Sequence, residues 1–112
     1  MVGTPPWELL DALDVRDGDP VLDKTRYSAF YGTWLEAHLR RTGVRDLVLC
    51  GVMTSCCIET TARDAFMRDF RVFVAADATA TATAELHVAS LRSMAYACAV
   101  VRATDDLALA FA

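Results

Sequence analysis

The sequence contains no long apolar run, which excludes the simplest way of crossing a membrane. No stretch approaches the ~20 consecutive apolar residues that a transmembrane helix requires, so we expect no membrane partner. The first 15 residues also lack a basic start followed by an apolar stretch, and carry Pro5-Pro6 and several acidic residues instead. That composition argues against a signal peptide. We therefore expect a cytoplasmic protein.

Positive charge is also scarce. The 11 basic residues are outnumbered by 15 acidic ones, the formal net charge is −4, and the basic residues are spread along the chain. Nucleic-acid binding usually requires a basic patch or stripe, so we expect no nucleic-acid partner. All but one of the basic residues are arginines, which leaves Lys24 as the only lysine.

Cysteine and histidine patterns that bind metals are missing. The cysteines are Cys50, Cys56, Cys57 and Cys98. They form no CxxC pair, and neither His38 nor His87 has a second ligand at a suitable spacing. We expect no metal, no cofactor and, in a cytoplasmic protein, free thiols instead of disulfides. The apolar patterning around Cys50, Cys56 and Cys98 favours reading these three as core residues.

The sequence does contain a regular alternation of short apolar runs and amphipathic stretches. The predicted strands are residues 20–24, 47–52, 71–76 and 99–102. The predicted helices are residues 34–41, 55–70, 84–97 and 105–111. This alternation is typical of a parallel sheet with helices between its strands. We therefore predict one α/β domain over residues 1–112, with a three-layer α/β/α, Rossmann-like parallel sheet.

Local signals define these elements further. Thr33 can cap the first helix, and Gly43 suits the cap at its end. Residues 47–52 are apolar on both faces, as in a buried parallel strand, and residues 77–81 read as a loop of small residues. Helical spacing predicts that the two longer helices bury Ile58, Ala62, Ala65, Phe66, Val88, Leu91 and Ala95. Two ion pairs are predicted on the outside of the second helix, Glu59/Arg63 and Asp64/Arg68.

The carboxyl ends of parallel strands meet at one edge of a sheet, where ligands of open α/β sheets bind. In this sequence those ends carry Lys24, residues 52–57 and Asp77. The topology therefore predicts a site at this edge. The simpler readings are that Lys24 is a solvated lysine and that Asp77 is an ordinary turn residue.

Cys57 is the residue with the most reactive side chain in that region. With Thr54 as N-cap, Cys57 falls in the first turn of a helix, where free N–H groups and the helix dipole favour a thiolate. An ammonium group nearby would favour the thiolate further. The same N–H groups could hold the oxyanion formed during acyl transfer. The alternative is that Cys57 is a small, buried apolar residue.

Two long motifs resemble one known family. Residues 51–65, GVMTSCCIETTARDA, are similar to the nucleophile segment of isochorismatase-like cysteine hydrolases, G-[VIL]-x-T-x-x-C followed by T-A-x-D-A. Residues 24–33, KTRYSAFYGT, are similar to the segment that supplies the family's catalytic lysine. Residues 77–80, DATA, and His87 match a further motif, and the similarity begins near Gly3-Thr4-Pro5 and Trp7-Glu8.

The resemblance implies roles for individual residues. Cys57 is the expected nucleophile and Lys24 the lysine that helps to ionise it. The Val52–Met53 bond is expected to be cis, with the N–H groups of Met53 and Cys57 forming the oxyanion hole. For the aromatic side chains Trp7, Tyr27, Phe30 and Tyr31 two readings stay open, contact with the substrate and packing in the core.

The resemblance also implies the reaction. Family members of the nicotinamidase and ureidoacrylate hydrolase branch cleave C–N bonds in small amides, ureides and carbamoyl compounds. Others hydrolyse the vinyl ether of isochorismate, and there glycine usually replaces the nucleophile, so Cys57 favours an amidohydrolase. The resemblance further implies a small-molecule substrate and a homo-oligomer.

One expected part of the family has no counterpart in the sequence. The family's first strand, its catalytic aspartate and the following helix would precede the matched region, as would the metal-ligand segment of nicotinamidases. We therefore expect a domain that is truncated at its N-terminal side. This leaves two alternatives open: a catalytically impaired remnant that serves as an assembly or interaction module, and, with less support, a thiol redox protein using Cys56 and Cys57.

Overall fold

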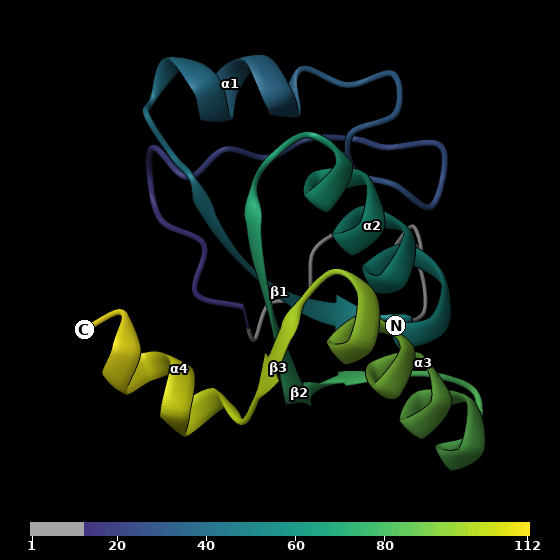
Figure 1. Ribbon diagram of the computed structural model, residues 1–112. Coiled ribbons are helices and arrows are strands. Elements are labelled where there is room, and N and C mark those ends of the chain that lie inside the picture. Colours follow the sequence, from purple (N-terminus) through teal and green to yellow (C-terminus); the bar gives the residue numbers. More distant parts are fainter. Residues whose placement is uncertain (1–12) are drawn as a thin grey trace, which may run out of the picture.

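The computed structural model describes residues 13–112. Its sheet has three parallel strands in the order β1-β2-β3 (Figure 1). The strands are β1 (Asp46–Val52), β2 (Arg71–Ala80) and β3 (Val100–Arg102). The helices are α1 (Leu35–Arg41), the π-helix η1 (Thr54–Ile58), α2 (Glu59–Met67), α3 (Ala84–Ala97) and α4 (Thr104–Ala110). The predicted α/β class with a parallel sheet is confirmed.

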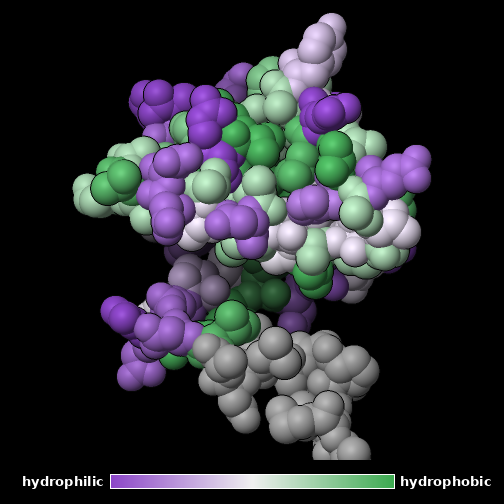
Figure 2. All heavy atoms as spheres, turned by 90° about the horizontal axis from the view of Figure 1, so that it is seen from below, coloured by the Kyte–Doolittle hydropathy of each residue, from purple (hydrophilic) through white to green (hydrophobic). Residues whose placement is uncertain are grey.

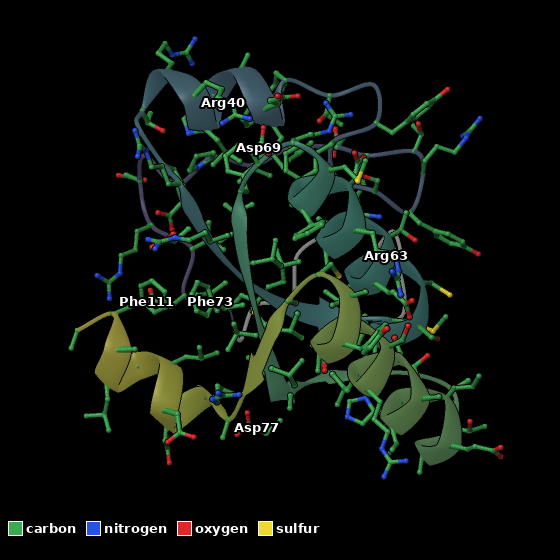
Figure 3. All side chains as sticks on the ribbon, viewed as in Figure 1. Arg40, Arg63, Asp69, Phe73, Asp77 and Phe111 are labelled. Atoms are coloured by element: carbon green, nitrogen blue, oxygen red, sulfur yellow. The ribbon has the colours of Figure 1, made fainter. Side chains whose placement is uncertain are left out.

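Helices pack on both faces of the sheet because side chains alternate along its strands. Val72 and Val74 of β2 belong to a buried cluster that also holds Ala62 of α2 and Met94 of α3. On the opposite face, Phe73 of β2 meets Phe111, just after α4, edge to face with ring centres 5.2 Å apart (Figure 3). The sheet is thus the middle layer of three, with α2 and α3 on one side and α4 on the other (Figure 1).

Most of the predicted local signals hold. The exception is Thr33, because the N-cap of α1 is Trp34, although Thr33 Oγ1 accepts a hydrogen bond from the N–H of Leu35 at 3.3 Å. Gly43 has a positive φ of 75° directly after the α1 cap, a conformation that glycine adopts without steric cost. Both predicted ion pairs form, at 3.1 Å and 2.7 Å, namely Glu59/Arg63 and Asp64/Arg68. The helix prediction for residues 84–97 agrees with α3 at both ends.

The predicted strand at residues 20–24 is wrong. These residues have no regular secondary structure, and four of the five are exposed. A strand requires a neighbour with which to share its backbone hydrogen bonds, and among the described residues no strand lies beside this segment. Pro20 also lacks an N–H to donate.

Two elements also end at positions other than those predicted. Strand β2 continues to Ala80 instead of ending at residue 76, so most of the predicted loop at 77–81 is strand. Its pairing with β1 shifts between Leu49 and Gly51, and this irregularity absorbs extra residues on β2. Helix α2 ends at Met67, before Asp69, whose φ is 69°. Such a left-handed residue cannot continue a right-handed helix.

Some predicted core positions are exposed. Phe66 is 49% exposed and Val88 46% exposed, and Ala95 is exposed as well. On α3 the buried positions are Ser90 and Met94, so the buried stripe is out of phase with the predicted one. Strand β1 is not buried on both faces either, because Val48, Cys50 and Val52 are exposed and a pocket lies between the first two and α4.

Apolar side chains consequently remain at the surface. The view from below shows hydrophobic residues exposed among hydrophilic ones (Figure 2). Within residues 13–112 no helix is both long and apolar enough to cross a membrane. The predictions that fall on Gly3-Thr4-Pro5 and on Trp7-Glu8, including Trp7 as a substrate contact, lie outside the described residues.

Candidate active site

Lys24 and Cys57 lie in direct contact although 33 positions separate them in sequence. The Lys24 ammonium donates a hydrogen bond to Cys57 Sγ at 3.2 Å. It also donates to the carbonyl oxygens of Arg26 at 3.0 Å and Tyr27 at 3.4 Å. The two carbonyls direct the ammonium toward the sulfur. Cys57 is half-buried and Lys24 is exposed, so the pair lies at the surface, within reach of a ligand.

The segment that carries Lys24 is held in place by helix α2. Ser28 donates to Asp64 at 2.6 Å, and Thr61 accepts from the N–H of Ala29 at 3.0 Å. Burial alone would raise the pKa of Asp64, but hydrogen bonds from Ser28 and Arg68 and the charge of Arg68 outweigh it and lower that pKa. An ionised Asp64 is therefore the stable anchor of this segment.

The Cys57 backbone follows directly from strand β1. The Val52–Met53 peptide bond is cis, and η1 begins at the next residue. The Met53 carbonyl accepts hydrogen bonds from the N–H groups of Cys56 and Ile58, each at 3.1 Å, and not from that of Cys57. Cys57 thus lies in a π-helical turn before α2. The prediction that it lies in the first turn of an α-helix capped by Thr54 is wrong.

Helix α3 holds the same turn from the other side. The Thr54 side chain is fully buried, and its Oγ1 lies 2.9 Å from His87 Nδ1. Ser90 Oγ lies 3.1 Å from the Thr54 carbonyl oxygen and 2.5 Å from Glu59 Oε1. The sequence pointed to His87 only through a motif and did not point to Ser90. The available signal was the spacing of His87 and Ser90, which are three positions apart and so lie on the same side of the helix.

An open pocket of about 390 Å³ surrounds the reactive pair. Its lining residues are Lys24, Thr25, Arg26, Tyr27 and Cys57. A neighbouring hollow of about 410 Å³ shares Arg26 and Tyr27 and is also lined by Tyr31. Tyr27 and Tyr31 are exposed beside Cys57 and available to a ligand. Phe30 is 5% exposed and packs on Phe70, so it belongs to the core and lines neither hollow.

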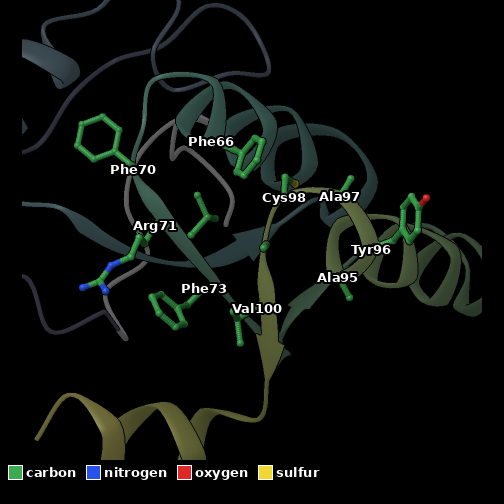
Figure 4. A pocket seen from close by; sticks show the side chains of 11 residues that line it. Phe66, Phe70, Arg71, Phe73, Ala95, Tyr96, Ala97, Cys98 and Val100 are labelled. Carbon is green, nitrogen blue, oxygen red and sulfur yellow. The ribbon is translucent and has the colours of Figure 1, made fainter.

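The other thiols have different surroundings. Cys98 is buried as predicted, and burial raises the pKa of its thiol, which therefore stays protonated. It lies in a second cavity of about 390 Å³, beside Phe66 and Tyr96 (Figure 4). Cys50 is exposed, so its prediction as a core residue is wrong, and Cys56 is half-buried. All four cysteines are free thiols.

Asp77 belongs to a different part of the structure. Its Oδ1 accepts hydrogen bonds from the N–H and the hydroxyl of Thr104, both at 2.7 Å, at the start of α4 (Figure 3). These two bonds lower the pKa of Asp77. Asp77 does not line the Cys57 pocket, so of the three predicted contributors only Lys24 and residues 52–57 come together.

Among residues 13–112, no three His, Cys, Asp or Glu side chains lie close enough together to hold a metal ion. The described residues therefore do not fit the donor set of a metal centre, and no chemical step is assigned to one.

The chain belongs to the isochorismatase family, because the model of the isochorismatase domain matches residues 2–106. It is 42% identical over 107 residues to nicotinamidase 3 of Arabidopsis thaliana, covering 94% of this chain and 54% of the relative. It is 48% identical over 77 residues to the ureidoacrylate amidohydrolase RutB of Methylorubrum extorquens, covering 69% of this chain and 31% of the relative.

Solved structures agree with this assignment. An isochorismatase-like hydrolase from Alkaliphilus metalliredigens superposes with a TM-score of 0.92 at 29% identity. The match covers 98% of this chain and 61% of that one. The chain thus spans only part of each of these relatives, about half the length of the plant nicotinamidase.

Proposed function

We propose that this chain carries the nucleophile of a cysteine hydrolase that cleaves a C–N bond in a small amide, ureide or carbamoyl compound. The observation that carries the proposal is the 3.2 Å contact between the Lys24 ammonium and Cys57 Sγ in an open pocket. A cation at this distance favours the thiolate, which is the nucleophilic form of cysteine. The names of the two relatives, a nicotinamidase and a ureidoacrylate amidohydrolase, support the choice of substrate class.

The proposed reaction adds one water molecule across the C–N bond. The Cys57 thiolate attacks the carbonyl carbon and forms a C–S bond, while the N–H groups of Met53 and Cys57 hold the oxyanion. The tetrahedral intermediate collapses, the C–N bond breaks, and the nitrogen leaves as ammonia or an amine after taking up one proton. Water then attacks the thioester, which releases the carboxylic acid and regenerates the thiolate.

The proton for the leaving group needs a donor. Within residues 13–112, the hydrogen-bond acceptors of the Lys24 ammonium are two carbonyl oxygens and Cys57 Sγ, with no carboxylate among them. We propose that this proton comes from solvent or from an acid outside the described residues. The family resemblance implies an aspartate in that role.

A substrate panel with product detection tests the proposal. The chain is incubated with nicotinamide, ureidoacrylate and a simple carbamoyl compound, and ammonia release is measured for the wild type and for Cys57→Ser. We expect ammonia from at least one compound and none above background with Cys57→Ser. Release of ammonia at equal rates by both proteins contradicts the proposal, as does hydrolysis of an isochorismate-type vinyl ether alone.

We further propose that the chain acts in the cytoplasm as part of a homo-oligomer. The exposed apolar side chains that support an assembly are those of Val48, Val52, Leu109 and Phe111. Contiguous exposed apolar surface is typical of protein interfaces. The four free thiols fit a reducing compartment. Light scattering on the purified chain tests the assembly, and a strictly monomeric chain at micromolar concentration contradicts it.

A further inference from the structure

A polar pair lies inside the structure directly behind the Cys57 turn. Thr54 has no exposed surface, and its hydroxyl is 2.9 Å from Nδ1 of the half-buried His87. Thr54 immediately follows the Val52–Met53 peptide and is the first residue of η1, three positions before Cys57. Any displacement of Thr54 therefore moves the backbone that carries both Met53 and Cys57.

The pair is part of a larger attachment of η1 to α3. Ser90, one helical turn after His87, is 5% exposed and contacts the Thr54 carbonyl oxygen and the Glu59 carboxylate. Glu59 in turn forms an ion pair with Arg63 at 3.1 Å. Apolar residues at positions 87 and 90 would fill the same space but would not fix the orientation of Thr54. Hydrogen bonds, by contrast, have preferred distances and angles, so they define where Thr54 lies.

We propose that His87 is a positioning residue for the Cys57 site. Its imidazole fixes the Thr54 hydroxyl and thereby holds the Met53 and Cys57 N–H groups in one arrangement. His87 lines neither hollow beside Cys57, so it acts through Thr54 and not on the substrate. The inference rests on the proposed function for its catalytic consequence, but its structural consequence can be measured without a substrate.

Four single variants, one double variant and a control separate positioning from general stability. His87→Ala and Thr54→Val each remove one partner of the hydrogen bond, and the double variant removes both. His87→Asn and Thr54→Ser keep a polar group at the position of each partner. Leu91→Ala is the control, because Leu91 packs on the core cluster from α3 and its side chain can form no hydrogen bond to Thr54. Melting temperatures are recorded for all of them.

The first measurement is amide hydrogen exchange at Cys56 and Ile58, whose N–H groups donate to the Met53 carbonyl. We expect exchange at these two amides to accelerate about tenfold in His87→Ala and in Thr54→Val. The double variant should exchange no faster than either single variant, because both substitutions remove the same hydrogen bond. In His87→Asn the exchange rate should return close to that of the wild type. Unchanged exchange in His87→Ala overturns the proposal, as does equal acceleration in Leu91→Ala.

The second measurement is kcat for the amide that the wild type hydrolyses best. We expect kcat to fall roughly tenfold or more in His87→Ala, with a smaller change in KM, because small misplacements of reacting groups are costly. Recovery is expected in His87→Asn. If no amide is hydrolysed, the proposed function fails, while the exchange data still decide whether His87 positions the turn. Wild-type kcat in a folded His87→Ala protein overturns the catalytic consequence.

Discussion

Replacing Lys24 by methionine tests the electrostatic basis of the site. The substitution keeps most of the side-chain length and removes the ammonium that lies 3.2 Å from Cys57 Sγ. Two unit charges at that distance attract by about 1.3 kcal/mol in a water-like dielectric and about 5 kcal/mol at an effective dielectric of ~20. Because Lys24 is exposed, the lower figure applies, and it corresponds to roughly a tenfold change in the rate of a reaction at the sulfur.

The assay is the rate at which iodoacetamide labels Cys57, followed by peptide mass spectrometry. At neutral pH we expect Lys24→Met to slow labelling about tenfold and Lys24→Arg, which keeps the charge, to slow it much less. The exposed thiol of Cys50 is an internal reference whose rate should not change. Near pH ~10, where thiols ionise without help, the variants should converge. Equal labelling of wild type and Lys24→Met at neutral pH would refute the reasoning.

Three further predictions concern stability. Hydrogen bonds from Thr104 lower the pKa of Asp77 in the folded protein, so their contribution to stability is complete above the ordinary pKa of the carboxyl group and is lost as pH falls from there through the lowered pKa. Urea unfolding at several pH values should show a smaller acid-side loss of stability in Asp77→Asn, and an identical loss would count against this. Ser28→Ala removes a donor to the partly buried Asp64 carboxylate and should lower the free energy of unfolding by roughly 1.5–3 kcal/mol, measured with urea. An unchanged urea midpoint would contradict this prediction. Met94→Ala empties a fully buried position and should cost about 2–5 kcal/mol, whereas a loss below ~1 kcal/mol would mean that the site collapses around the gap.

The elements that the sequence predicted correctly depend on local chemistry. Gly43 ends α1 because a left-handed residue is needed there, and the charge pairs on α2 form because residues four apart lie on one side of a helix. The contact of Lys24 with Cys57 followed from the two motifs, and not from the rule that strand ends share an edge, because residues 20–24 form no strand. That rule also failed for Asp77, which lies inside β2 and accepts hydrogen bonds from Thr104 at the start of α4.

The failures share one physical cause, which is that burial depends on what packs against an element. Residues 20–24 have the composition of a strand but no neighbouring strand among the described residues. Helix α3 carries apolar residues on several sides, so its period alone could not show that Ser90 and Met94 face inward. The contact between Thr54 and His87 joins residues 33 positions apart and has no local signature.

The central claim is that Cys57 is acylated during hydrolysis, and mass spectrometry of the chain quenched during turnover tests it most directly. We predict an added mass equal to the acyl part of the substrate, assigned to Cys57 by fragmentation of the peptide that also contains Cys50, with no such adduct on Cys50 or in Cys57→Ser. An adduct on another residue, or continued hydrolysis by Cys57→Ser, would contradict the account.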